Sequence, residues 1–265
     1  MSPTASARPF PLRIRNLKHN KTSMETRLNE KYTDLCRQYH VSVSIVLTND
    51  ASLPKQEICE KDGISVIKLN TAHIQDTDYE MHLAYNVGNV LLPRLVLETE
   101  RLILRRFQPK DALDCFAFLS AEKDCYMDCS KPFTEMNDEY TERMDLFASR
   151  ETQYMIVLKE SGKVIGTVNV FDDDSRAVDA KEIGYAVSPS YQRKGYAYEA
   201  LTALVDLLQN DLKFDLVVAG VLEENVASIR LLEKLGFRKE GLRRKAVWHE
   251  GLDRPVDLIY YYRDR

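Results

Sequence analysis

The segment Ser188-Pro-Ser-Tyr-Gln-Arg-Lys-Gly-Tyr-Ala197 is the clearest indication of fold in this chain. It follows an apolar run, Ile183–Val187, that is typical of a β-strand, and it leads into a long helical segment, Tyr198–Leu208. A strand that turns into a helix through a glycine-containing loop points several backbone N–H groups in one direction. Because the positive end of the helix dipole lies at the same place, this loop predicts an anion site suited to a pyrophosphate.

The residues around this loop alternate between strand patterns and helix patterns. Short β-branched and apolar runs predict strands, and apolar residues that recur every three or four positions predict helices. The pattern therefore predicts a mixed α/β architecture that extends from residue 97 to residue 265. The predicted strands are 97–107, 154–158, 164–170, 183–187 and 216–222, the predicted closing hairpin is 237–262, and the predicted helices are 111–119, 135–149, 198–208 and 226–235.

Several motifs in this half resemble those of the GNAT-family acyltransferases. Gln192-Arg-Lys-Gly-Tyr-Ala197 resembles the Q/R-x-x-G-x-G/A motif with which that family holds the pyrophosphate of acetyl-CoA. The segment Asn225–Phe237 resembles the family signature N-x-x-S-x-x-x-x-E-K-x-G-F. Glu100-Arg-Leu-Ile-Leu-Arg105 and Glu182-Ile-Gly-Tyr185 resemble the branch related to ribosomal-protein N-terminal acetyltransferases, which also contains enzymes that modify small amines and antibiotics. The resemblance covers residues 97–265.

The resemblance implies a GNAT fold of the α/β (α+β) class, with a mixed, splayed central sheet flanked by helices. It also implies an acyl-CoA-dependent N-acetyltransferase that uses acetyl-CoA as co-substrate. The acetyl group would pass to a primary amine, either a protein N-terminus or a small amine, by direct attack in a ternary complex. In this fold two central parallel strands separate and the acyl-pantetheine arm lies between them. The resemblance assigns those strands to residues 181–187 and 216–222.

The cofactor contacts implied by the resemblance lie on one strand, one loop and one helix start. The strand would pair with the pantetheine arm, and the loop amides would hold the phosphates. Asn225 would contact the arm, although asparagine at a helix start is also a good N-cap. Arg193 and Lys194 could add charge, but solvated side chains are the alternative, which we prefer for Arg193. The expected cofactor-binding residues are Tyr185, Ala186, Val187, Gln192, Arg193, Lys194, Gly195, Tyr196, Ala197 and Asn225.

Two residues are the candidates for acid–base chemistry. An amine attacks a thioester only when it is neutral, so the site must accept a proton and stabilise an oxyanion. Glu182 is the candidate general base, and the alternative is that it pairs with an Arg or Lys of a neighbouring strand. Many GNAT enzymes have a tyrosine acid seven residues after the motif asparagine, whereas this chain has Leu232. Ser228 is the substitute candidate, with a plain first-turn helix residue as the alternative.

Composition limits the other possibilities. The net charge is −4, and no basic stripe predicts nucleic-acid binding. No apolar run approaches the length of a membrane span, so we expect no membrane association. The five cysteines form no C-x-x-C pair, and an odd number without a signal peptide favours a reducing cytoplasm. We expect no metal, and a homodimer is possible. Cys125-x-x-x-Cys129 falls in the expected acceptor loop with Tyr126 and Met127, where buried structural thiols are the alternative.

The first half predicts a separate small domain. Residues 1–21 are expected to be a loose lead-in, residues 22–95 a small α+β domain, and residues 96–265 the acetyltransferase domain. Patterns in 22–95 predict a helix at 24–39, strands at 41–47 and 63–70, and a helix at 76–92. The role of this domain is left open by its sequence.

The last of these helices resembles the zinc-binding helix of ImmA/IrrE-type metallopeptidases, which typically reads L-A-H-E-L-G-H-x-L-L-P. Zinc hydrolysis needs two histidines one turn apart, with a glutamate beside the metal-bound water. This chain has Tyr85 and Asn89 at the histidine positions and Asn86 at the glutamate position. The resemblance therefore implies a degenerate fold without zinc ligands or peptidase activity. An unrelated α+β cap is the alternative.

Two other functions remain open beside the enzyme. The first is a binding module that senses acetyl-CoA without turnover, which Leu232 favours. The second is a regulatory role, in which residues 22–95 bind a partner or peptide and present it to the transferase.

Overall fold

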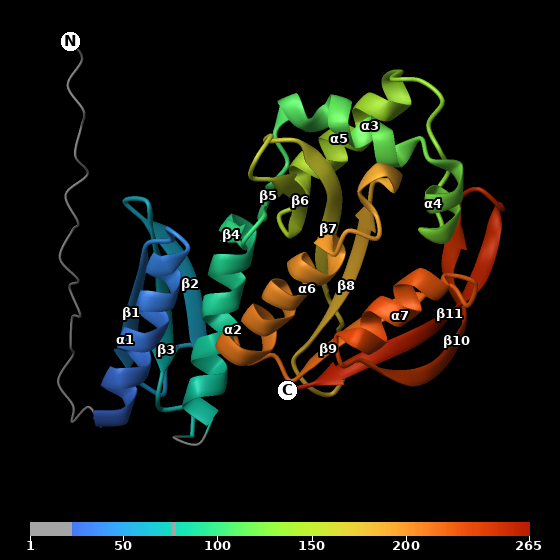
Figure 1. Ribbon diagram of the computed structural model, residues 1–265. Coiled ribbons are helices and arrows are strands. Elements are labelled where there is room, and N and C mark those ends of the chain that lie inside the picture. The colour runs from blue at the N-terminus through green and yellow to red at the C-terminus, as the bar shows by residue number, and fades with distance from the viewer. Residues whose placement is uncertain (1–22, 76–77) are drawn as a thin grey trace, which may run out of the picture. The chain divides into compact units, whose positions relative to one another are not determined.

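A computed structural model of the chain describes residues 23–75 and 78–265 (Figure 1). The predicted lead-in at 1–21 and the first two residues of the helix predicted at 76–92 lie outside the described residues. The chain divides into two compact units, one up to Val90 and one from Leu91. Each unit is described by itself.

The first unit combines two helices with a three-stranded sheet. The sheet has the order β1-β3-β2, with β1 and β3 parallel and β2 antiparallel to β3. The strand β2 is absent from the sequence prediction because nearly all of its side chains are exposed, which removes the alternation that marks a strand. The elements are α1 (Ser23–Gln38), β1 (Val43–Thr48), β2 (Gln56–Lys61), β3 (Ile64–Asn70) and α2 (Tyr79–Leu91).

Polar contacts join the two helices of this unit. The buried Tyr79 hydroxyl donates to Asn29 Oδ1 at 2.6 Å, and Lys31 pairs with Glu80 at 2.8 Å. Asn86, at the position where the metallopeptidase helix has its glutamate, is buried and donates to the His82 carbonyl and to Gln56 Oε1. Its amide thus ties α2 to β2.

The second unit is built on an eight-stranded sheet in the order β10-β11-β9-β8-β7-β6-β5-β4. Only β8 and β9 are parallel, and the other neighbours are antiparallel. The strands are β4 (Leu97–Glu98), β5 (Leu102–Arg106), β6 (Gln153–Leu158), β7 (Val164–Asp172), β8 (Ala180–Val187), β9 (Leu216–Val221), β10 (Arg238–His249) and β11 (Arg254–Asp264).

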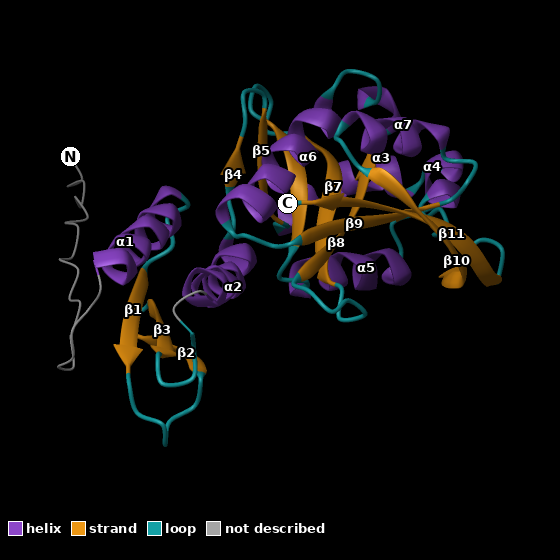
Figure 2. Ribbon diagram, turned by 90° about the horizontal axis from the view of Figure 1, so that it is seen from below, coloured by secondary structure: helices purple, strands orange, loops and turns teal. Residues whose placement is uncertain are grey.

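Helices cover both faces of this sheet, with α5 on the face opposite to α6 and α7 (Figure 2). The helices are α3 (Ala112–Leu119), α4 (Glu122–Met127), α5 (Asp138–Ser149), α6 (Tyr196–Asp206) and α7 (Val226–Lys234). A π-helical turn, Leu207–Asp211, continues α6, and short 3-10 turns lie at Leu92–Arg94, Pro109–Asp111 and Pro189–Tyr191.

The central parallel pair separates along its length. Residues Ala180–Glu182 of β8 pair with Leu216–Val218 of β9, and the pairing ends there. On its other edge, β8 stays paired with β7 as far as Val187, opposite Gly166. The second half of β8 therefore presents one backbone edge away from β7 where the two parallel strands part. This geometry confirms the predicted splayed sheet of a GNAT fold.

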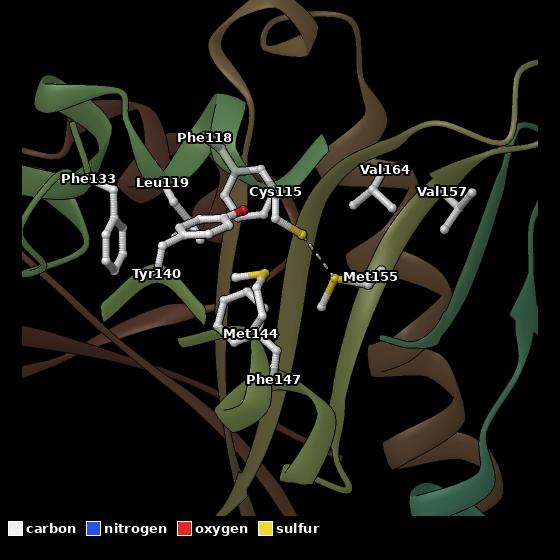
Figure 3. Packing of buried hydrophobic residues seen from close by; sticks show 10 residues of the cluster. All are labelled: Cys115, Phe118, Leu119, Phe133, Tyr140, Met144, Phe147, Met155, Val157 and Val164. Carbon is white, nitrogen blue, oxygen red and sulfur yellow. Dashed lines mark hydrogen bonds between the residues drawn. The ribbon is translucent and has the colours of Figure 1, made fainter. Parts of the chain in front are cut away.

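A buried hydrophobic cluster joins α3 and α5 to β6 and β7 (Figure 3). Side chains of α5, among them Tyr140 and Phe147, pack with those of α3 and with β6 and β7. The Cys115 thiol lies 3.8 Å from the Met155 sulfur, and burial raises the pKa of Cys115 to about 12. Cys115 is therefore a neutral packing residue rather than a reactive thiol.

The prediction of a single strand at 97–107 is wrong. The chain turns at Thr99–Arg101, where the Thr99 amide donates to the Leu102 carbonyl and the Leu102 amide donates to the Thr99 hydroxyl. The result is a two-residue strand β4 followed by β5. The helix predicted at 135–149 begins instead at Asp138, because the Asn137 side chain caps it by accepting from the Tyr140 amide.

Candidate active site

A groove of about 820 Å³ opens where β8 and β9 separate. Its walls are the end of β8, the loop that follows, the first residues of α6 and α7, and the short helix α4. The structure brings together nearly all the predicted cofactor-binding residues in this groove, and Lys194 is the one that is not among its lining residues. The lining includes Tyr185, Ala186, Val187, Gln192, Arg193, Gly195, Tyr196, Ala197 and Asn225.

The loop between β8 and α6 has the backbone of an anion site. Arg193 and Gly195 both have left-handed conformations, with φ of 61° and 85°. Gly195 is the N-cap residue of α6 and offers no side chain to the first N–H groups of the helix. These amides therefore keep their hydrogen-bonding capacity for a ligand. A side chain on Gly195 would be strained at this φ and would come within 3.4 Å of the Arg101 guanidinium.

Arg101 holds this loop from the start of β5, a role that the sequence did not indicate. Its Nη1 donates to the Lys194 carbonyl at 3.1 Å, its Nε donates to Glu199 at 2.6 Å, and its guanidinium lies 4.5 Å from the centre of the Tyr196 ring. Burial alone would raise the pKa of Glu199, but hydrogen bonds from Thr99 and Arg101 hold it below its ordinary value. Glu199 is thus an ionised anchor for Arg101.

The side chains of Gln192 and Lys194, two of the predicted cofactor-binding residues, contact other residues of the protein. The Gln192 amide donates to the Val187 carbonyl at 2.9 Å and to Asp124 at 2.8 Å. It thereby links the loop both to β8 and to α4. The Lys194 ammonium lies 5.2 Å from the centre of the Tyr191 ring. The backbone of this loop, rather than these side chains, is the part arranged for an anion.

The start of α7 faces β8 across the groove. Asn225 is the N-cap of α7, and its side chain accepts from the Ser228 amide at 3.2 Å. The Ser228 hydroxyl lies 2.7 Å from the Tyr185 hydroxyl. Burial raises the pKa of Tyr185 to about 12, although the contact with Ser228 opposes this. Leu232 is fully buried, so no acid group replaces the family tyrosine at that position.

Glu182 lies at the point where β8 and β9 separate. It is opposite Val218 in the last pair, and it accepts a hydrogen bond from the Tyr260 hydroxyl at 3.3 Å. Burial raises its pKa, and the hydrogen bond from Tyr260 opposes part of that rise. Arg243, stacked 4.3 Å from the centre of the Tyr260 ring, further favours the ionised carboxylate. Glu182 does not line the 820 Å³ groove.

A second, smaller cavity of about 70 Å³ lies on the other face of β8. Side chains alternate along a strand, so Ala186 points away from the face on which Tyr185 reaches α7. The cavity is enclosed by α3, α4, α5, β6 and β7. Asp124, Asp128, Ala186 and Val187 line both this cavity and the groove, so the two spaces meet at the end of β8.

The predicted acceptor loop around Cys125 and Cys129 contains the short helix α4. Both thiols are buried, and Cys125 donates to the Leu119 carbonyl at 3.3 Å. Cys125 also lines the smaller cavity, whereas Cys129 lines neither space, so the structural alternative fits Cys129. Asp128, between them in sequence, lines both spaces, and its position in the sequence does not distinguish it from a solvated carboxylate.

Gly166 sets the spacing of β7 and β8 at this site. A Cβ atom on Gly166 would lie 2.2 Å from the Ala186 carbonyl oxygen and 3.0 Å from the Val187 Cα. The Ser188 amide also donates to the Ile165 carbonyl at 2.7 Å. The absence of a side chain thus allows β8 to approach β7 closely where it lines both cavities.

Two features are absent from the described residues. Between residues 23 and 265, apart from 76 and 77, we find no helix long and apolar enough to cross a membrane. Across the same residues, no three His, Cys, Asp or Glu side chains are grouped so that they could hold a metal ion.

The sequence of this chain is similar to those of acetyltransferases. The acetyltransferase (GNAT) domain family matches residues 101–238. The N-acetyltransferase p20 of Bacillus licheniformis, which is uncharacterised, is 36% identical over 172 residues, covering 62% of this chain and 93% of that protein. YjcK of Bacillus subtilis strain 168, named as a probable N-acetyltransferase, is 36% identical over 114 residues, covering 43% of this chain and 62% of that protein. The [ribosomal protein uS5]-alanine N-acetyltransferase of Escherichia coli K12 is 26% identical over 173 residues, covering 60% and 87%.

Solved structures share the fold of the same region. A GNAT-family acetyltransferase from Bacillus anthracis aligns with a TM-score of 0.56 and 24% identity, covering 64% of this chain and 98% of that one. The microcin C7 self-immunity acetyltransferase MccE, solved in complex with acetyl-CoA and AMP, aligns with a TM-score of 0.53 and 17% identity, covering 63% and 94%.

Proposed function

Because this chain belongs to the acetyltransferase (GNAT) family, we propose that it transfers an acetyl group from acetyl-CoA to a primary amine by direct attack in a ternary complex. One observation carries the proposal: the groove joins the unpaired edge of β8 to an anion-binding loop. A thioester arm linked to a pyrophosphate needs both features in one continuous space. The volume of the groove lies within the range of small-molecule sites.

The residues of the groove fit the parts of acetyl-CoA. The amides of Arg193–Ala197 would bind the pyrophosphate, helped by the start of α6. The backbone of Tyr185–Val187 would pair with the amides of the arm, and one of its N–H groups would polarise the thioester carbonyl. Asn225 would keep its capping role while its side chain contacts the arm.

Proton transfer in this proposal uses Glu182 and the pair Tyr185–Ser228. Glu182 would accept the proton of the acceptor amine, through a water where needed, as the amine attacks the carbonyl carbon. The C–S bond then breaks and leaves a thiolate. With a pKa raised to about 12, the Tyr185 hydroxyl is a much weaker acid than a thiol, whose pKa is about 8.5. We therefore assign to Tyr185 and Ser228 hydrogen bonding to the leaving sulfur rather than complete proton transfer.

This assignment predicts that substitutions of Tyr185 and Ser228 have small effects on kcat. Ser228→Ala and Tyr185→Phe should each lower kcat by about tenfold or less, since each removes one hydrogen bond worth about 1 kcal/mol. Steady-state rates at saturating acetyl-CoA measure the effect. A loss of about a thousandfold in either variant would instead identify a dedicated general acid.

The Arg101 contacts predict a distinct effect on cofactor affinity. Arg101→Ala removes the hydrogen bond to the Lys194 carbonyl and the contact with the Tyr196 ring, so the loop loses its anchor. We expect the Kd for acetyl-CoA, measured by calorimetry, to rise about tenfold. Arg244→Ala, which removes an exposed arginine of β10, is the matched control and should leave the Kd unchanged. Equal affinities in the two variants would contradict this role of Arg101.

Two classes of acceptor amine are proposed. The [ribosomal protein uS5]-alanine N-acetyltransferase supports a protein N-terminus, and small amines are the other class. The test is acetyl-CoA-dependent thiol release with polyamines, aminoglycosides, amino acids and peptides with free N-termini. Turnover with one class supports the enzyme and identifies its acceptor. Tight acetyl-CoA binding without turnover on any acceptor would favour the sensor, and residues 23–75 and 78–90 would then be examined for partner binding.

A further inference from the structure

The small cavity beside β8 has polar walls, and most of the charged groups in them already have partners. The Arg143 guanidinium lies 3.4 Å from both carboxylate oxygens of Glu250. Arg150 donates to Gln153 at 3.3 Å, and Asp124 accepts from Gln192 at 2.8 Å. Three of the four charged residues that line the cavity thus already have partners.

Asp128 differs from these groups. It lines both the cavity and the groove, and across residues 23–75 and 78–265 its carboxylate has no hydrogen-bond donor. Its side chain is exposed and lines both spaces. Desolvation by nearby protein atoms raises the pKa of Asp128 to about 6; Arg143 opposes the rise and Glu250 adds to it. A carboxylate in this situation gains from a cationic partner.

A second acceptor without a partner lies in the same cavity. Asn169 of β7 lines it, and the Oδ1 atom of Asn169 is buried without a hydrogen-bond donor among the described residues. A buried carbonyl oxygen without a donor is destabilising unless a ligand or water supplies one. Asp128 and Asn169 therefore both present acceptors to one space, which is the pattern that binds an ammonium group with its three N–H donors.

We propose that this cavity binds the ammonium head of the acceptor, with Asp128 as its counter-ion and Asn169 Oδ1 accepting one of its N–H groups. The inference rests on the proposed function and names the substrate class: a primary amine that is cationic in solution and compact next to its nitrogen. The cavity volume of about 70 Å³ is roughly half of the about 150 Å³ that holds a benzene molecule, so an aromatic head would not enter.

The position of the cavity explains how binding leads to reaction. Asp128 lies where the cavity meets the groove, beside Ala186 and Val187, and the thioester carbonyl is assigned to the same strand. Because side chains alternate along a strand, Glu182 and Ala186 lie on the same face of β8, which is the face of the cavity. Asp128 thus selects and positions the ammonium. Glu182 accepts one of its protons to give the neutral amine that attacks, and the proton that the nitrogen loses after the attack passes to the departing thiolate.

The experiment uses the full chain saturated with coenzyme A and propylammonium as the probe. Calorimetry or NMR titration gives the Kd of propylammonium for the wild type, Asp128→Asn and Glu142→Gln, the last being an exposed carboxylate of α5 next to Arg143. We expect Asp128→Asn to weaken propylammonium binding about tenfold or more, and Glu142→Gln to leave it unchanged. Coenzyme A affinity, measured in the same samples, should be equal in all three.

The pH dependence of propylammonium affinity provides a second test. Because the charged form of Asp128 binds the ammonium, affinity should fall as the pH drops through about 6 in the wild type and not in Asp128→Asn. The other charged groups near Asp128 are Arg143, Arg150, Asp124 and Glu250, and each of them has a hydrogen-bond partner within the protein. Propylammonium affinity that is absent in the wild type, or equal in Asp128→Asn, overturns the proposal. Failure of all three proteins to bind coenzyme A overturns the proposed function instead.

Discussion

Glu182→Gln is expected to lower kcat about a hundredfold or more, because it removes the group that accepts the proton of the amine. Glutamine keeps the volume of the side chain, and its carbonyl oxygen can still accept the hydrogen bond from Tyr260. The fold and the groove should therefore be unchanged, and the Kd for acetyl-CoA should stay within about twofold of the wild type. Steady-state kinetics and calorimetry measure the two quantities.

The pH dependence of kcat tests the direction of the pKa shift of Glu182. Burial raises the pKa of Glu182. The fraction of ionised Glu182, and with it kcat, should therefore rise with pH, with a midpoint above the pKa of an ordinary glutamate. Tyr260→Phe removes the hydrogen bond that lowers this pKa and should move the rise to higher pH. If Glu182→Gln keeps the wild-type turnover over the whole profile, Glu182 is not the base.

Gly166→Ala is expected to damage both stability and cofactor binding. The added Cβ would lie 2.2 Å from the Ala186 carbonyl oxygen, and because that atom is backbone, β8 itself must shift. Overpacking of this kind costs about 1–3 kcal/mol of unfolding free energy. The shift falls on residues that line the groove, so we also expect acetyl-CoA affinity to fall about tenfold or more.

Gly184→Ala on β8 is the matched control for stability. A Cβ there would meet its neighbours at 3.9 Å, which is ordinary van der Waals contact. Urea unfolding should show a loss for Gly166→Ala and little change for Gly184→Ala. Equal stability of Gly166→Ala and the wild type would show that β7 and β8 adjust without cost.

The sequence predicted the strand, loop and helix around Gly195 well because their signal is local. A strand, a glycine at a left-handed position and a helix follow one another between Ile183 and Asp206, so no distant contact is needed to identify them. The splayed strands were assigned by resemblance to a family rather than by periodicity. The structure then showed where the pairing of β8 with β9 ends.

Other parts of the site depend on contacts between distant residues. Arg101 meets Lys194, 93 positions later in the chain, and the pattern around Arg101 is that of an ordinary half-buried strand. Gly166 is required by the backbone of β8, which its own strand pattern does not reveal. Asp128 is one of many acidic residues, and its surroundings become visible only when α4, α5 and β8 are assembled.

The central claim is that acetyl-CoA binds where β8 and β9 separate, and a crystal structure of the full chain with coenzyme A tests it most directly. Our account predicts the pyrophosphate at the amides of Arg193–Ala197 and the pantetheine arm along the free edge of Tyr185–Val187. Coenzyme A bound elsewhere, or this groove empty at saturating coenzyme A, would contradict the account.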